Sequence, residues 1–234
     1  MSKPDHFHPK VRKLVVVFDI CSSTLILNDL IQTENQRKWA DLLIRLKEFL
    51  AGRSLDHNFE IYKFLGDGYI LIFNVIYNPS ALLTFLREIS VHFRDDYSRN
   101  IKRLLQAPPT SIGITFGVEA GSLMKLTMLN RREYVGRALN VASRLQNALK
   151  DKDKAPANKV LLASHYYWSM RHFILPWKGK RVRRDLRNIG TGIYCYKIEL
   201  LPRVNPTGRP RTSENGLRKS KRETSKGAKS RAGH

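Results

Sequence analysis

The sequence predicts an α/β sandwich whose helices pack on a largely antiparallel sheet built around a ferredoxin-like split βαβ core. Two observations lead to this fold class. Short runs rich in Val, Ile, Phe and Tyr alternate with longer segments at helical spacing. Several of the short runs are separated by only a few residues, which favours antiparallel hairpins. The 234 residues suit one domain of roughly 150–200 residues and a tail.

The first strand is predicted at 14–20, because the continuous apolar run LVVVFDI is typical of a central strand covered on both faces. A helix is predicted within 28–50, with Gly52 as its C-terminal cap. A hairpin follows at 59–75, and Gly66-Asp67-Gly68 gives its turn an acidic tip. Strict alternation in its first strand would place Phe59, Ile61, Lys63 and Leu65 on one face and Glu60, Tyr62 and Phe64 on the other.

The second half of the chain begins with a predicted helix that Asn78-Pro79 opens and that ends before Pro108. The predicted elements in order are a helix at 79–105, strands at 110–118 and 122–129, a helix at 137–150, a strand at 159–163, a helix at 164–171 and a strand at 192–200. The helix at 137–150 is expected to turn Leu139, Ala142, Leu145 and Leu149 inward.

The charge balance is strongly basic, with 42 Lys and Arg against 20 Asp and Glu and a net charge of +22. Such a balance indicates a nucleic-acid or anionic-membrane partner. Residues 203–234 carry a net +8 and almost no large apolar side chains, so they are predicted to be a disordered tail. The folded domain is predicted at 12–202 after a flexible N-terminus, 1–11, and it holds a second basic cluster at 178–184.

Cysteine content and hydropathy predict a cytoplasmic protein. No apolar run approaches the roughly 20 residues that a membrane span needs. The first residues lack the apolar segment of a secretory signal. Cys21 and Cys195 are too few for a disulfide framework, which fits a reducing compartment.

Two carboxylates, Asp19 and Asp67, stand at the tips of predicted central elements. A strand end beside a hairpin tip brings carboxylates together, and Mg²⁺ prefers carboxylate and carbonyl oxygens with substrate phosphate. Two ions about 3.5–4 Å apart activate an attacking hydroxyl and stabilise a leaving phosphate. Acids at such positions are also common as turn residues, so the pair by itself leaves both interpretations open.

Four segments in fixed order sharpen this hypothesis: FDICSST (18–24), KFLGDG (63–68), SIGITFGVEAG (111–121) and EYVGRALNVASRL (133–145). Over about residues 12–200 the chain resembles the catalytic domain of class III nucleotide cyclases, the adenylate and guanylate cyclase superfamily. The resemblance implies that Asp19 and Asp67 hold two Mg²⁺ or Mn²⁺ ions per site, with the carbonyl of Ile20 as a further ligand.

The same resemblance assigns four residues to the substrate, a nucleoside triphosphate. Lys63 and Glu133 would contact the base, Asn140 would orient the ribose, and Arg144 would stabilise charge on the α-phosphate in the transition state. It also implies a homodimer with two equivalent sites, in which one protomer gives the metal carboxylates and its partner gives Lys63, Asn140 and Arg144.

Plain structural roles compete with these assignments. Lys63 would then be a solvated strand residue, and Asn140 and Arg144 a capping and surface pair. Glu133 would pair only with Arg131, Arg132 or Arg137. Tyr62 and Tyr134 are interpreted as packing residues.

The residues alone do not determine which nucleotide base is bound, since a Lys donor and a carboxylate acceptor fit adenine, cytosine or uracil. Glu133 is one methylene longer than the Asp usual in adenylate cyclases, which suits a smaller pyrimidine, and Arg137 replaces an acidic residue common in the family. The compact chain resembles the pyrimidine cyclases of the Pycsar anti-phage system. That implies conversion of UTP to cyclic UMP and diphosphate, and a separate effector protein that the cyclic nucleotide activates.

Several other functions also fit the sequence. A cytidylate cyclase, or an adenylate cyclase in general signalling, would use the same residues. A degenerate cyclase would only sense nucleotide, and a diguanylate cyclase would need a Gly-Gly-Asp/Glu-Glu-Phe turn that the chain lacks. A basic nucleic-acid-binding protein that works through its tail is the non-enzymatic alternative, less favoured than the cyclase.

Overall fold

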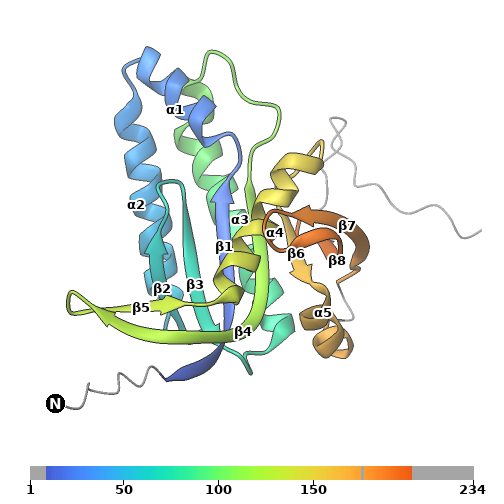
Figure 1. The fold of residues 1–234 in the computed structure, drawn as a ribbon. Helices are drawn as coiled ribbons and strands as arrows, with labels where there is room; N and C mark the ends of the chain where they lie inside the picture. The colour runs from blue at the N-terminus through green and yellow to red at the C-terminus, as the bar shows by residue number, and fades with distance from the viewer. Residues whose placement is uncertain (1–8, 175–176, 202–234) are drawn as a thin grey trace, which may run out of the picture. The chain divides into compact units, whose positions relative to one another are not determined.

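One eight-stranded sheet runs through the computed structural model, which describes residues 9–174 and 177–201 (Figure 1). The strand order is β2-β3-β1-β4-β6-β8-β7, with β5 paired to β4. The strands are β1 (Lys10–Ile20), β2 (Phe59–Phe64), β3 (Gly68–Asn74), β4 (Ile114–Met128), β5 (Arg131–Val135), β6 (Lys159–Ala163), β7 (Lys180–Leu186) and β8 (Gly190–Glu199). Only the pair of β4 and β6 is parallel among these, so the predicted mostly antiparallel α/β fold is confirmed.

The helices cover the two faces of the sheet unequally. They are α1 (Ser23–Gln32), α2 (Gln36–Arg53), α3 (Pro79–Asn100), α4 (Arg137–Lys152) and α5 (Ser164–Met170). Side chains of α1, α2, α3 and α5 share one large core with the sheet, whereas α4 packs on the opposite face (Figure 1). No described helix combines the length and the hydropathy that a membrane span requires. The predicted tail, 203–234, and residues 1–8 lie outside the described residues.

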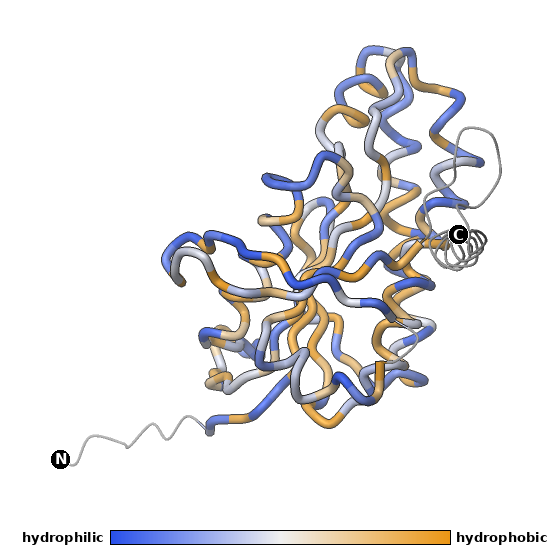
Figure 2. Tube along the Cα trace, turned by 90° about the vertical axis from the view of Figure 1, so that its right-hand side faces the viewer, coloured by the Kyte–Doolittle hydropathy of each residue, from blue (hydrophilic) through white to orange (hydrophobic). Residues whose placement is uncertain are grey.

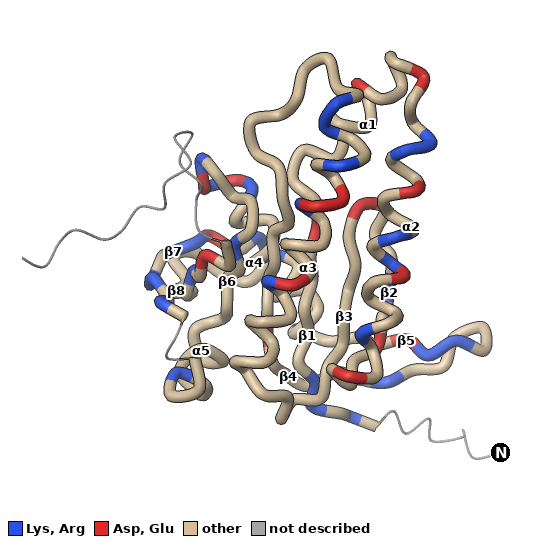
Figure 3. The backbone as a smooth tube through the Cα atoms, turned by 180° about the vertical axis from the view of Figure 1, so that it is seen from behind, with Lys and Arg blue, Asp and Glu red and all other residues tan. Residues whose placement is uncertain are grey.

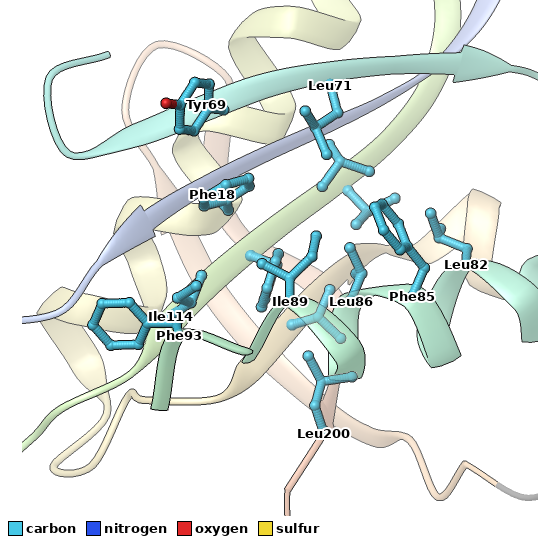
Figure 4. Close-up of a cluster of buried hydrophobic side chains, with 14 of the residues drawn as sticks. Phe18, Tyr69, Leu71, Leu82, Phe85, Leu86, Ile89, Phe93, Ile114 and Leu200 are labelled. Carbon is cyan, nitrogen blue, oxygen red and sulfur yellow. The ribbon is translucent and has the colours of Figure 1, made fainter. Parts of the chain in front are cut away.

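The central position predicted for the first strand is confirmed, since β1 lies between β3 and β4. It begins at Lys10, four residues before the predicted start. Its side chains alternate between the two faces: Phe18 packs in the larger core, whereas Val15 and Val17 pack on the α4 side. Figure 4 shows Phe18 among the side chains of β3 and α3 in the larger core. Hydrophobic segments gather along these central strands (Figure 2).

The single helix predicted within 28–50 is wrong, because α1 and α2 are separate helices. The break lies at 33–35, where Glu34 has a φ of 58°. The hydroxyl of Thr33 donates to the carbonyl of Asp29, and the side-chain amide of Asn35 donates to the carbonyl of Thr33 at 2.7 Å. Such local bonds compete with the helical ladder and end it. Gly52, predicted as a cap, lies inside α2.

The strict alternation predicted for β2 is also wrong. The pairing with β3 shifts between Ile61, which faces Leu71, and Lys63, which faces Ile70. An extra residue of this kind is a β-bulge, and it reverses the faces of the residues that follow. Lys63 therefore leaves the face of Phe59 and Ile61 and joins the α4 side of the sheet.

The two strands predicted at 110–118 and 122–129 form one strand, β4, which pairs with β1 without interruption from Ile114 to Met124. A hairpin missed in the sequence follows, because Leu129 and Asn130 both have positive φ and turn the chain into β5. Strand β7 was also missed, since its four Lys and Arg residues hide the apolar alternation.

The remaining predicted elements are found with small changes. Helix α3 begins as predicted, and the side chain of Asn78 caps it by accepting from the amides of Ser80 and Ala81 at 2.9 and 3.1 Å. It ends at Asn100, and a short 3₁₀ turn (Lys102–Leu104) follows. The observed β6 has the predicted bounds, and α4, α5 and β8 differ from theirs by one or two residues.

Gly117 fixes how closely α4 approaches the sheet. A Cβ at this position would lie 2.0 Å from the carbonyl oxygen of Ala142 and 2.5 Å from the amide nitrogen of Gln146. Gly117→Ala must push α4 away, so we expect it to lower the free energy of unfolding by about 3 kcal/mol, measured by urea denaturation. Gly52→Ala is the control, because its Cβ meets no atom within 4 Å and a helical alanine is preferred to glycine. Equal stability of the two variants would contradict the close approach.

Candidate active site

Asp19 and Asp67 lie side by side, as the sequence predicts. Asp19 pairs directly with Gly68 in the ladder of β1 and β3, and the amide of Ile20 donates to the carbonyl of Asp67 at 3.2 Å. A Cβ on Gly68 would lie 2.0 Å from the carbonyl oxygen of Phe18, so only glycine permits this approach. The end of the central strand and the hairpin tip therefore present two carboxylates at one point.

The electrostatics of this pair suit a bound cation. Burial, and then the neighbouring carboxyl of Asp67, raise the pKa of Asp19 to about 7. Asp19 Oδ1 is buried without a hydrogen-bond partner, while Ser23 Oγ donates to Asp67 Oδ2. An unpartnered buried carboxylate oxygen is costly unless a positive group fills the place. The donor set therefore fits a hard divalent cation.

Lys150, at the C-terminal end of α4, reaches this same point and was not predicted. Its ammonium donates to Asp19 Oδ2, and also to the carbonyl oxygen of Ile20 at 3.2 Å. Both oxygens belong to groups that are predicted from the sequence to hold metal ions. The lysine thus supplies one positive charge where divalent cations are expected.

The protein itself offers few ligands here. Within residues 9–174 and 177–201 no group of three or more His, Cys, Asp and Glu side chains is arranged to hold a metal ion. Two carboxylates and one carbonyl leave most coordination positions to water and to substrate phosphate. That is the usual way in which Mg²⁺ is held in phosphoryl-transfer sites.

A second cluster joins Lys63, Glu133 and Tyr62. The bulge in β2 turns Lys63 toward β5, where its Nζ lies 3.7 Å from Glu133 Oε2. The hydroxyl of Tyr62 donates to the same Oε2 at 2.5 Å and accepts from the amide of Tyr134 at 2.9 Å. The two residues predicted to contact the base are thus neighbours, and Tyr62 fixes the position of the carboxylate.

The hydrogen bond from Tyr62, with the ammonium of Lys63 nearby, lowers the pKa of Glu133 below its ordinary value. Glu133 is therefore ionised at neutral pH and accepts hydrogen bonds only. Lys63 donates only, and more than half of its side chain is exposed. The pair offers one donor and one acceptor to a ligand at the surface.

Asn140 and Arg144 are not bonded to either cluster. Asn140 is exposed and Arg144 is half-buried, and neither side chain makes a hydrogen bond or an ion pair with any described residue. Asn140 stands ten residues before Lys150 on α4, about 15 Å along the helix axis. Within one chain, Lys150 contacts the paired carboxylates, and Asn140 and Arg144 do not.

Solved structures share this architecture. The adenylyl cyclase CyaB from P. aeruginosa matches with a TM-score of 0.63 at 18% identity, over 82% of this chain and 95% of that chain. Adenylate cyclases from Trypanosoma brucei in their monomeric state match with a TM-score of 0.60 at 14% identity, over 83% of this chain and 90% of that chain. The chain has the fold of a nucleotide cyclase catalytic domain.

The structure of the guanylyl cyclase Cya2 also matches, with a TM-score of 0.59 at 13% identity, over 82% of this chain and 93% of that chain. No protein-family model and no curated protein matches the chain. At these identities the likeness establishes the fold alone.

Three residues contact the predicted site residues but were not themselves predicted from the sequence to belong to the site. Ser23 stands in the FDICSST segment, where a hydroxyl four residues after Asp19 is a signal that could have been used. Tyr62 is predicted as a packing residue, and in the structure its hydroxyl also donates a hydrogen bond to Glu133. For Lys150 the sequence has no local signal, because α4 and β1 meet only in the folded chain.

Proposed function

We propose that the protein is a nucleotide cyclase, which converts a nucleoside triphosphate to the 3′,5′-cyclic nucleotide and diphosphate. The observation that carries the proposal is the pairing of Asp19 and Asp67, with one buried carboxylate oxygen left unpartnered, in a chain with the cyclase fold. Asp19, Asp67 and the carbonyl of Ile20 would hold two Mg²⁺ or Mn²⁺ ions.

The reaction needs a 3′-hydroxyl aligned with the α-phosphorus and a way to stabilise negative charge. Asp19, Asp67 and the carbonyl of Ile20 would hold divalent cations, which when bound would supply Lewis-acid activation of the hydroxyl and neutralise phosphate charge. Arg144 would place its unpaired guanidinium against the α-phosphate, where charge builds as diphosphate leaves. Asn140 would hydrogen-bond the ribose and hold the 3′-hydroxyl in line.

A homodimer with shared sites would unite the parts that one chain keeps separate. Asn140 and Arg144 are unpartnered within the described chain, and the carboxylates lie near the other end of α4. The β4–β5 hairpin projects from the sheet (Figure 1) and exposes Met128, Leu129 and Val135. Apolar side chains on a projecting hairpin fit a second copy of this chain.

Among substrates we favour UTP, with cyclic UMP as a second messenger in anti-phage defence that activates a separate effector protein. Ionised Glu133 would accept from the ring N–H of uracil, and Lys63 would donate to a carbonyl beside it. Cytidylate and adenylate cyclisation are the alternatives. A cytoplasmic location suits this role.

Incubating the protein with each of the four triphosphates and Mn²⁺ tests the activity and its base. We expect UTP to give the dominant cyclic product, and a chelator to abolish it. Glu133→Asp shortens the acceptor by one methylene, so it should lower the ratio of kcat/KM for UTP over ATP roughly tenfold, about 1.4 kcal/mol.

Glu48→Asp, at an exposed position of α2, is the control and should leave that ratio unchanged. Dominant cyclic AMP formation by the unaltered protein would overturn the pyrimidine assignment and leave the cyclase proposal standing. Absence of every cyclic product from folded protein would overturn both.

A further inference from the structure

A basic surface with no part in the proposed reaction covers the sheet edge at β7 and β8. Figure 3 shows Lys and Arg repeated along these strands and at α5. Arginines and rings alternate on the face turned away from α4. We call this the arginine–aromatic face and define it as Trp168, Arg171, Arg181, Arg183 and Tyr194.

The pairing of the two strands builds the face. Arg183 stands opposite Tyr194 in the ladder, and Arg181 stands opposite Tyr196. The guanidinium of Arg181 lies 3.6 Å from the centre of the Tyr194 ring, and that of Arg183 lies 5.3 Å from it. Two cations thus hold one exposed ring at the sheet edge.

Helix α5 extends the same face. The ring of Trp168 meets that of Tyr196 edge-on, at 5.8 Å between centres, and Arg171 lies 4.8 Å from the centre of the Trp168 ring. About half of Trp168 and two-fifths of Tyr194 remain exposed. The buried ring of Tyr196, opposite Arg181 in the ladder, thus connects the exposed Trp168 of α5 to the strands that carry Arg181 and Tyr194.

The three arginines keep their charge available. None of Arg171, Arg181 and Arg183 forms an ion pair with a carboxylate among the described residues. Asp185 of β7 has its Oδ1 occupied, because this oxygen accepts from the amide of Gly192 at 2.7 Å in the turn to β8. Arg183 Nε donates to the carbonyl oxygen of Gly192 at 3.3 Å, and the rest of its guanidinium is left for a ligand. A guanidinium that no described carboxylate neutralises is suited to a charge-assisted hydrogen bond with phosphate.

We propose that the arginine–aromatic face binds single-stranded nucleic acid. Arginines spaced along a strand contact successive phosphates, and exposed bases stack on aromatic rings and guanidinium planes. A duplex keeps its bases stacked inside, so it can use the charges but not the rings. Neither metal carboxylate takes part, so the proposal is independent of cyclase activity.

The test is fluorescence anisotropy of a labelled single-stranded oligonucleotide with the full chain, over a series of salt concentrations. Arg181→Gln combined with Arg183→Gln removes two phosphate contacts. We expect about tenfold weaker binding and a slope of log K against log salt that is smaller by about 1.4. Tyr194→Leu keeps the charge, so it should weaken binding about fivefold with the slope unchanged.

Arg37→Gln combined with Arg87→Gln is the matched control. It removes the same charge from exposed positions of α2 and α3 and keeps residues 203–234, so its slope should stay near that of the unaltered protein. All variants are first compared by thermal melting.

If the control lost as much affinity for the oligonucleotide as the Arg181 and Arg183 variant, the proposal would be overturned, since net charge alone would then explain binding. Full binding by Tyr194→Leu, or equal affinity for a duplex of the same length, would overturn the stacking role. If the variants lost binding to phosphatidylserine vesicles and kept it to the oligonucleotide, the face would be a membrane surface instead.

Discussion

Two inactive variants of this chain, Asp67→Asn and Arg144→Ala, are expected to recover activity when their protomers are mixed. Each variant alone should lose roughly a thousandfold in kcat, because one lacks a carboxylate that would hold the metal ions and the other lacks the guanidinium that would stabilise charge on the α-phosphate. If the site is shared, a mixed dimer has one site with both defects and one with neither. Random exchange makes half of the dimers mixed, so about a quarter of the unaltered activity should return.

The matched control mixes Asp67→Asn with Asp19→Asn. These carboxylates belong to the same half of the site, so every site in a mixed dimer keeps one defect and activity should stay low. Dimer exchange is checked by mass measurement of tagged protomers. If both mixtures gave the same low activity although mixed dimers had formed, Asn140 and Arg144 would not act across the interface.

The sequence predicted best what depends on local pattern. The run LVVVFDI indicated a central strand, and Gly66-Asp67-Gly68 indicated a tight turn, so both carboxylates were placed at the ends of neighbouring elements. The closeness of Asp19 and Asp67 then follows from the antiparallel pairing of β1 and β3. That pairing is a property of the folded sheet, and the sequence did not predict which strands are neighbours.

The failures have physical causes. The alternation of side chains between the two faces of a strand does not reveal the bulge that turns Lys63 toward Glu133. The extra residue of a bulge is defined only by the pairing with the partner strand, here β3. Strand β7 was missed because the hydrophobic signal of an edge strand is weak when one of its faces carries arginines. The contact of Lys150 with Asp19 depends on how α4 packs across β1, which no local pattern encodes.

The second large effect is expected when Lys150 is substituted, and it is a change in the affinity of the site for metal ions. The ammonium of Lys150 occupies Asp19 Oδ2 and the carbonyl of Ile20, so a divalent cation that uses these oxygens must displace it. The displaced ammonium loses a half-buried ion pair and also repels the incoming cation. The lysine would then be free to meet the phosphates of a bound substrate. We therefore expect Lys150 to raise the metal concentration that is needed to fill the site.

Lys150→Met should raise the affinity for Mn²⁺ about tenfold, about 1.4 kcal/mol, measured without substrate by electron paramagnetic resonance of the free ion. Lys152→Met removes an equal charge from the exposed end of the same helix and should leave the affinity unchanged. In an Asp67→Asn background the gain should shrink, since half of the carboxylate pair is gone. If Lys150→Met bound Mn²⁺ no more tightly than Lys152→Met, the ammonium would not compete with metal, and Lys150 would serve only to anchor α4 to the end of β1.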